Sequence, residues 1–146
     1  MGDDSETQAL IAAARAAMAH AHAPYSRFAV GAAVRLIDGS IVTGCNFENA
    51  SYGLSVCAET VALATVNAQG RFADVAAIAV VGGAMDSEQE ALVTPCGRCR
   101  QRHRHGAGVR ANLPTERPPP RLQMQMVLMG RIIVGAQHGA EDPAAL

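Results

Sequence analysis

Two short cysteine motifs constrain the fold of this 146-residue chain more than any other feature. Cys57-Ala58-Glu59 opens one predicted helix, and Pro95-Cys96-Gly97-Arg98-Cys99 opens a second. Two helix N-termini that face each other would bring three thiolates to one point, where backbone N–H groups and helix dipoles stabilise negative charge. A fold in which these two distant segments meet would therefore contain a cluster of three thiolates.

The chemistry expected at such a point is that of a metal centre with one open position. Three sulfurs leave one tetrahedral position of Zn²⁺ free, and an open position distinguishes a catalytic zinc from a structural one. Glu59 follows Cys57 by two residues, so its carboxylate is expected beside that position, where it could pass protons from water to a substrate nitrogen. Because Zn²⁺ with three thiolates has a formal charge of −1, helix dipoles and at least one arginine are needed for balance.

Other interpretations of the cysteines and histidines remain open. Cys45 lies in a predicted strand, and we expect it to pack in the core rather than bind metal. Cys96 and Cys99 could form a redox pair, although nothing around them resembles a thioredoxin-like motif. His103 and His105 could join them as metal ligands, but a solvated basic stretch is the favoured interpretation.

The hydrophobic pattern predicts alternating helices and strands. Asp38-Gly39 separates two apolar runs, which predicts a hairpin with a tight primed turn. Gly82-Gly83 is expected to end a buried strand. The predicted helices span 6–22 and 57–69 and start again near 96, and the predicted strands span 28–37, 40–47, 75–81, 91–93, 122–126 and 132–134. Residues beyond Gln101 are not expected to support a stable helix.

Charge is distributed unevenly, although the formal total is only −1. Residues 1–97 contain 4 arginines and 10 acidic residues, whereas residues 98–131 contain 8 arginines and 1 acidic residue. Such a basic block could contact nucleic acid. No aromatic residue follows Phe72, however, so a stacking platform for bases is missing, and no nucleic-acid partner is expected.

Neither a membrane span nor a secretory signal is expected. No uncharged stretch exceeds the 11 residues of Val75–Met85, which is well short of the roughly 18 residues that a membrane helix needs. Gly2-Asp3-Asp4-Ser5-Glu6 is acidic where a secretory signal would be basic. The four cysteines are more often metal ligands or reactive groups than disulfides in a reducing compartment, and we predict a cytoplasmic protein.

An ordered set of motifs resembles the small, homotetrameric, three-cysteine class of cytidine deaminases over about residues 5–101. The two cysteine motifs match that class, including the non-ligand glutamate of zinc-dependent base deaminases. The resemblance implies a single domain over 1–146 with a three-layer α/β/α fold and a mixed sheet of about five strands. The other matching segments are Pro24-Tyr25-Ser26-Arg27-Phe28, Val30-Gly31-Ala32-Ala33 and Thr43-Gly44-Cys45-Asn46-Phe47-Glu48-Asn49-Ala50-Ser51-Tyr52-Gly53.

The resemblance also implies residue roles. One Zn²⁺ per subunit would be bound by Cys57, Cys96 and Cys99, and Glu59 would be the catalytic proton carrier. The remaining roles concern the nucleoside: Phe28 packs on the pyrimidine ring, Asn46 and Glu48 hydrogen-bond the ribose, the Ala58 backbone contacts the base, and Ala50 and Tyr52 reach a neighbouring subunit's site. The reaction would convert cytidine or deoxycytidine to the uridine form plus ammonia, in pyrimidine salvage.

Two features depart from the family pattern. The family often has arginine directly after the catalytic glutamate, donating to the thiolates; here that position is Thr60, and Arg98 is our candidate to compensate. The second departure is the tail at 102–146, where Arg, His and Pro replace an amphipathic helix, strands and a late aromatic residue. A frameshift or natural divergence would each account for such a tail.

Two other functions are kept as alternatives. A related deaminase acting on a modified nucleoside or an aminopyrimidine antibiotic would share the zinc motifs, but Asn46 with Glu48 favours ordinary nucleosides. A catalytically inactive zinc-binding module would keep the cysteines while the altered tail abolishes activity.

Overall fold

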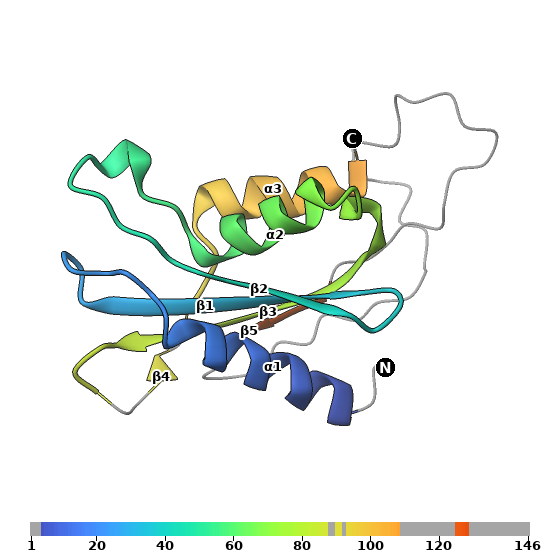
Figure 1. Cartoon of the computed structure of the whole chain (residues 1–146), viewed down its shortest axis with the longest axis horizontal. Coiled ribbons are helices and arrows are strands. Elements are labelled where there is room, and N and C mark those ends of the chain that lie inside the picture. The colour runs from blue at the N-terminus through green and yellow to red at the C-terminus, as the bar shows by residue number, and fades with distance from the viewer. Residues whose placement is uncertain (1–3, 88–89, 92, 109–124, 129–146) are drawn as a thin grey trace, which may run out of the picture.

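A computed structural model describes residues 4–87, 90–91, 93–108 and 125–128 (Figure 1). In chain order the elements are α1 (Asp4–Met18), β1 (Phe28–Leu36), β2 (Ile41–Cys45), η1 (Tyr52–Leu54), α2 (Ala58–Ala68), η2 (Phe72–Asp74), β3 (Val75–Ala84), β4 (Glu90–Ala91), α3 (Gly97–Gly108) and β5 (Gln125–Leu128). The strand predicted at 132–134 and most of the divergent tail lie outside the described residues.

The three long strands form an antiparallel sheet in the order β2-β1-β3. β1 lies between the other two and pairs with β3 along its whole length. Two short strands share the far edge of β3: β4 pairs antiparallel with Gly82 and Gly83, and β5 pairs parallel with Ala77–Val80. The predicted α/β class is confirmed.

Each face of the sheet is buried by a helix, because successive strand residues point to opposite faces. On one face, Ala33 of β1 packs with the buried side of α1. On the other face, Ala32 and Val34 pack with α2. Figure 1 shows α1 on one side of the sheet and α2 with α3 on the other. The first turns of α2 and α3, which carry the cysteine motifs, therefore lie on the same side of the sheet.

The predicted hairpin between β1 and β2 is confirmed, but its turn is not the primed one. That turn requires positive φ at both central residues, and of the pair only Gly39 has it, at 85°. The Leu36 N–H donates to the Ser40 carbonyl at 2.9 Å, which closes a loop containing a type I turn and a glycine bulge.

Hydrogen bonds from the Ser40 side chain and backbone lower the pKa of Asp38 to about 2.

The prediction that Gly82-Gly83 ends the third long strand is wrong, since β3 continues through both glycines to Ala84. A Cβ atom on Gly82 would lie 2.6 Å from Val93 Cγ1 and 3.0 Å from Phe28 Cε1. Glycine is therefore needed here for close packing across the strand rather than for a break.

Two helix ends also differ from prediction. α1 ends at Met18 rather than near His22, because the His22 N–H donates at 3.0 Å to the carbonyl of Asn46 in another segment. α3 continues to Gly108, although no helix was expected beyond Gln101. Once the first turn has formed, extension costs little, and arginine is a good helix former. No helix of the described part of the chain is long and apolar enough to cross a membrane.

Gly44 allows α2 to approach β2 closely, and we expect Gly44→Ala to destabilise the fold. A Cβ there would lie 2.6 Å from the Ala62 nitrogen and 2.7 Å from the Ala58 carbonyl oxygen, both backbone atoms. The overpacking should lower the free energy of unfolding by about 1–3 kcal/mol in urea denaturation. Gly53→Ala is the control, since a Cβ at Gly53 meets nothing within 4 Å. Equal stability of the two variants would contradict the close approach.

Candidate metal centre and active site

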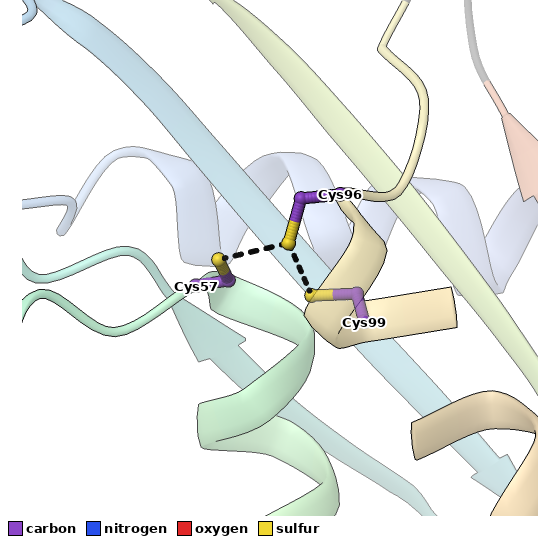
Figure 2. Close-up of side chains that lie close together, drawn as sticks. All are labelled: Cys57, Cys96 and Cys99. Atoms are coloured by element: carbon purple, nitrogen blue, oxygen red, sulfur yellow. Dashed lines mark hydrogen bonds between the residues drawn. The ribbon is translucent and has the colours of Figure 1, made fainter. Parts of the chain in front are cut away.

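Three cysteines from two helix starts converge as predicted (Figure 2). Cys57 is the N-cap residue of α2, Cys96 directly precedes α3, and Cys99 lies in the first turn of α3. Their sulfur atoms all lie within 4.8 Å of one another. Cys99 is buried, Cys57 half-buried and Cys96 exposed. Among the described residues, this group could hold one metal ion.

The sulfur spacing fits zinc. A tetrahedral zinc with bonds of about 2.3 Å would separate its sulfur ligands by about 3.8 Å. The Sγ atoms of Cys57 and Cys96 are 3.7 Å apart, and those of Cys96 and Cys99 are 3.5 Å apart. Three soft sulfur donors at this spacing suit zinc and leave a fourth position for water or substrate.

The three thiols differ in how easily they ionise. Burial is the main cause that raises the pKa of Cys57 and of Cys99, and the charge of Glu59 raises both further. Burial also opposes ionisation of Cys96, but hydrogen bonds, first among them one from the Cys99 backbone, outweigh it and lower the pKa. Because a metal binds thiolates, metal binding must release protons from Cys57 and Cys99.

Glu59 is a buried carboxylate beside this cluster, with 5% of its surface exposed. It lies in the first turn of α2 and lines the same cavity as Cys57 and Cys96. Its charge acts on both Cys57 and Cys99, as expected for a carboxylate close to the sulfurs. Such a group can carry a proton between water and a bound ligand without itself being a metal ligand.

A cavity of about 470 Å³ opens beside the cluster, a size typical of small-molecule sites. It brings together most of the predicted site residues, namely Phe28, Asn46, Glu48, Tyr52, Cys57, Ala58, Glu59 and Cys96. Tyr52, predicted to reach a neighbouring subunit, lines the cavity of its own chain with 88% of its surface exposed. Ala50 is exposed and is not among the lining residues.

Asn46 and Glu48 are held by backbone groups at the start of β1. Asn46 Nδ2 donates to the Phe28 carbonyl at 3.0 Å, and its Oδ1 accepts the Val30 N–H at 2.8 Å. Glu48 Oε2 accepts the backbone N–H groups of Tyr25 and Ser26 at 3.0 and 3.1 Å. Both side chains are thereby fixed at the cavity wall, with the second carboxylate oxygen of Glu48 outside these bonds.

Sequence reasoning missed several lining residues: Val30, Ser55, Val56, Val80, Val93 and Thr94. Val30 could have been found from Phe28, because strand residues two apart share a face. Val80 enters the site only through the register of β3 with β1, where it pairs with Ala32. No local signal in the sequence gives that register.

Arg98 is the one cationic side chain among the residues that line this cavity. The thiolates and the carboxylates of Glu48 and Glu59 give the cavity excess negative charge once a metal is bound. That Arg98 offsets part of this charge, in place of the arginine that Thr60 replaces after Glu59, stays a prediction.

Arg98→Gln is expected to weaken zinc retention a few-fold, by about 0.5–1 kcal/mol, because the arginine is exposed and partly screened. Competition with a chromogenic chelator measures this without reference to activity. Arg102→Gln is the matched control, since Arg102 lies one turn further along α3 and lines a different cavity. Equal chelator sensitivity of the two variants would refute a specific role for Arg98.

Comparisons with known proteins agree with this site. Residues 4–110 match the family model of the cytidine and deoxycytidylate deaminase zinc-binding region. The chain is 50% identical over 96 residues to a cytidine deaminase of Halalkalibacterium halodurans, covering 66% of this chain and 68% of that protein. It is 48% identical over 85 residues to the cytidine deaminase of Mycobacterium tuberculosis, covering 58% of this chain and 59% of that relative.

Solved structures extend the similarity over more of the chain. The crystal structure of cytidine deaminase from Burkholderia pseudomallei superposes with a TM-score of 0.65 at 41% identity, covering 87% of this chain and 89% of that one. The cytidine deaminase from Mycobacterium tuberculosis gives 0.63 at 36% identity, covering 86% and 87%. With a family match over most of its length and three sulfurs that could hold a metal ion, the chain belongs to the cytidine and deoxycytidylate deaminase family.

Proposed function

We propose that this protein catalyses the zinc-dependent hydrolytic deamination of cytidine and deoxycytidine to uridine and deoxyuridine, with release of ammonia. The observation that carries the proposal is the meeting of three cysteine sulfurs and buried Glu59 at one cavity. The membership of the chain in a deaminase family supports the same reaction.

The cysteines and the glutamate at the metal centre have different tasks. Cys57, Cys96 and Cys99 hold the zinc, which supplies Lewis-acid activation of water when bound. The Glu59 carboxylate accepts a proton from the attacking water, whose oxygen forms a bond to C4, and donates that proton to N3 of the base. Glu59 then carries the second water proton to the departing amino group, so that the C4–N bond breaks as ammonia forms.

Substrate contacts come from the other lining residues. Phe28, half-buried at the start of β1, packs on the pyrimidine ring, and the Ala58 backbone contacts the base. Glu48 and Asn46 bind the ribose. Glu48 has a carboxylate oxygen outside its backbone hydrogen bonds, which makes it the stronger candidate for a sugar hydroxyl.

The assembled enzyme is a homotetramer in which Ala50 and Tyr52 also reach a neighbouring subunit's site. Large exposed apolar side chains support self-association, since Tyr52 is 88% and Leu54 64% exposed. The working context is pyrimidine salvage in the cytoplasm. Each subunit is one domain over 1–146 with three α/β/α layers and a mixed sheet of about five strands, consistent with the parallel pairing of β5 to β3.

The test is a substrate panel with the zinc-loaded protein. Cytidine and deoxycytidine should be converted, whereas an aminopyrimidine antibiotic should be converted much more slowly. A strong preference for the antibiotic or for a modified nucleoside would replace the proposed substrate while keeping the reaction. Absence of turnover with every compound would favour an inactive zinc-binding module, which the family match does not favour.

A further inference from the structure

The turn that leads into β1 is tied to Glu48 through Ser26. The Ser26 N–H donates to Glu48 Oε2 at 3.1 Å, and hydrogen bonding from Ser26 is the main cause that lowers the pKa of Glu48. The same serine's Oγ accepts the Phe28 N–H at 3.1 Å. Ser26 therefore connects a cavity carboxylate to the backbone of the residue that forms part of the cavity wall.

Arg27, which lies between Ser26 and Phe28, has an unusual backbone conformation. Arg27 has a φ of 56°, in the left-handed region that non-glycine residues rarely adopt. Such a conformation persists only when its surroundings hold it. The Arg27 N–H donates to the Ala23 carbonyl at 3.0 Å, and the Arg27 carbonyl accepts the Met85 N–H at 2.8 Å. The hydrogen bonds of Ser26 are therefore among several that fix this turn.

Phe28 is consequently held at both of its backbone polar groups. Its N–H is bound by Ser26 Oγ, and its carbonyl accepts from Asn46 Nδ2 at 3.0 Å. Its ring lines the cavity and lies against Gly82, where a Cβ would be 3.0 Å from Cε1. With backbone and ring both confined, the position of the aromatic wall depends on the turn before β1.

We propose that Ser26 is a positioning residue, which fixes Phe28 at the cavity wall by joining the Phe28 N–H to the Glu48 carboxylate. Ser26 is not among the lining residues and need not touch the substrate. The metal cluster and Glu59 belong to other elements, so the loss of Ser26 should weaken substrate binding more than chemistry. This inference rests on the proposed cytidine deamination.

The experiment compares Ser26→Ala with Ser26→Thr and Ser40→Ala. Ser26→Ala removes the acceptor, so KM for cytidine should rise about 2- to 10-fold while kcat stays close to wild type. Ser26→Thr retains the hydroxyl and should restore KM. Ser40, another exposed turn serine with side-chain hydrogen bonds, donates to Asp38 and accepts from Arg71 away from the cavity, so Ser40→Ala should leave KM unchanged.

A second readout tests the contact itself. Hydrogen exchange of the Phe28 amide, followed by NMR, should be faster in Ser26→Ala than in wild type or Ser26→Thr. Faster exchange in Ser26→Ala with unchanged KM would mean that the bond between the Phe28 N–H and Ser26 Oγ is merely structural, which would overturn the proposal. Unchanged exchange in Ser26→Ala would overturn it too. A zinc-loaded wild type that does not turn over cytidine overturns the proposed function, whereas an active wild type with no KM change in Ser26→Ala overturns this inference alone.

Discussion

Glu59→Gln is expected to remove nearly all cytidine turnover, by roughly 10²- to 10⁴-fold in kcat, while zinc stays bound. Glutamine has the same shape as glutamate but cannot accept and return a proton. Because Glu59 lies beside the cluster and is 5% exposed, no bulk water molecule can easily replace it as the proton carrier. Ammonia release measures turnover, and metal analysis of the same sample measures bound zinc.

Glu48→Gln is the matched control, since the same substitution is made at the other carboxylate that lines the cavity. Glutamine retains an oxygen that can accept the Tyr25 and Ser26 N–H groups. We expect Glu48→Gln mainly to raise KM. If Glu59→Gln retained most of the wild-type rate with zinc bound, Glu59 would not be the proton carrier and the proposed mechanism would fail.

Cys99→Ala should lose both zinc and turnover. Cys99 is fully buried in the cluster, and alanine leaves two sulfurs that cannot hold a tetrahedral zinc as three do. Since zinc binding to the native protein adds to its stability, the variant should also unfold at a lower temperature than the zinc-loaded wild type. Zinc content per chain and the thermal midpoint are the two measurements.

Cys45→Ala controls for the loss of any cysteine. Cys45 is half-buried in β2 and lies outside the three-sulfur group. Zinc content and turnover should remain at wild-type levels in Cys45→Ala, although a partly buried sulfur is lost. One zinc per chain in Cys99→Ala would contradict the assignment of the cluster as the metal centre.

The metal cluster could be predicted from sequence because its signals are local. Cys57 and Cys96 each lie at a helix start, and the resemblance to three-cysteine deaminases implied that these two helix starts meet. The predicted helix over 57–69 and the observed α2 agree within one residue at each end. The distances between the sulfurs, and therefore the fit to zinc, required the fold.

The errors arise where tertiary contacts override local preference. Gly82 looks like a strand end in sequence, yet its missing side chain makes room for Phe28 and Val93. Asn46, which we propose as a ribose contact, also has both of its amide atoms bound to the backbone of β1, which no local pattern predicts. Neither contact is visible without the strand register.

The extent of the family resemblance also exceeded the prediction. The match to the family model runs to residue 110, beyond the predicted limit near Gln101. This agrees with the continuation of α3 to Gly108. The run of Arg and His residues before Gly106 therefore concealed the continuation of this helix in the sequence.

The most direct test of the central claim is the loss of cytidine absorbance when the purified, zinc-loaded wild-type protein is mixed with cytidine, with Glu59→Gln as the blank. The account predicts steady conversion to uridine by the wild type and a flat trace for the variant. A flat trace for soluble wild type carrying one zinc per chain would contradict cytidine deamination as the function of this site.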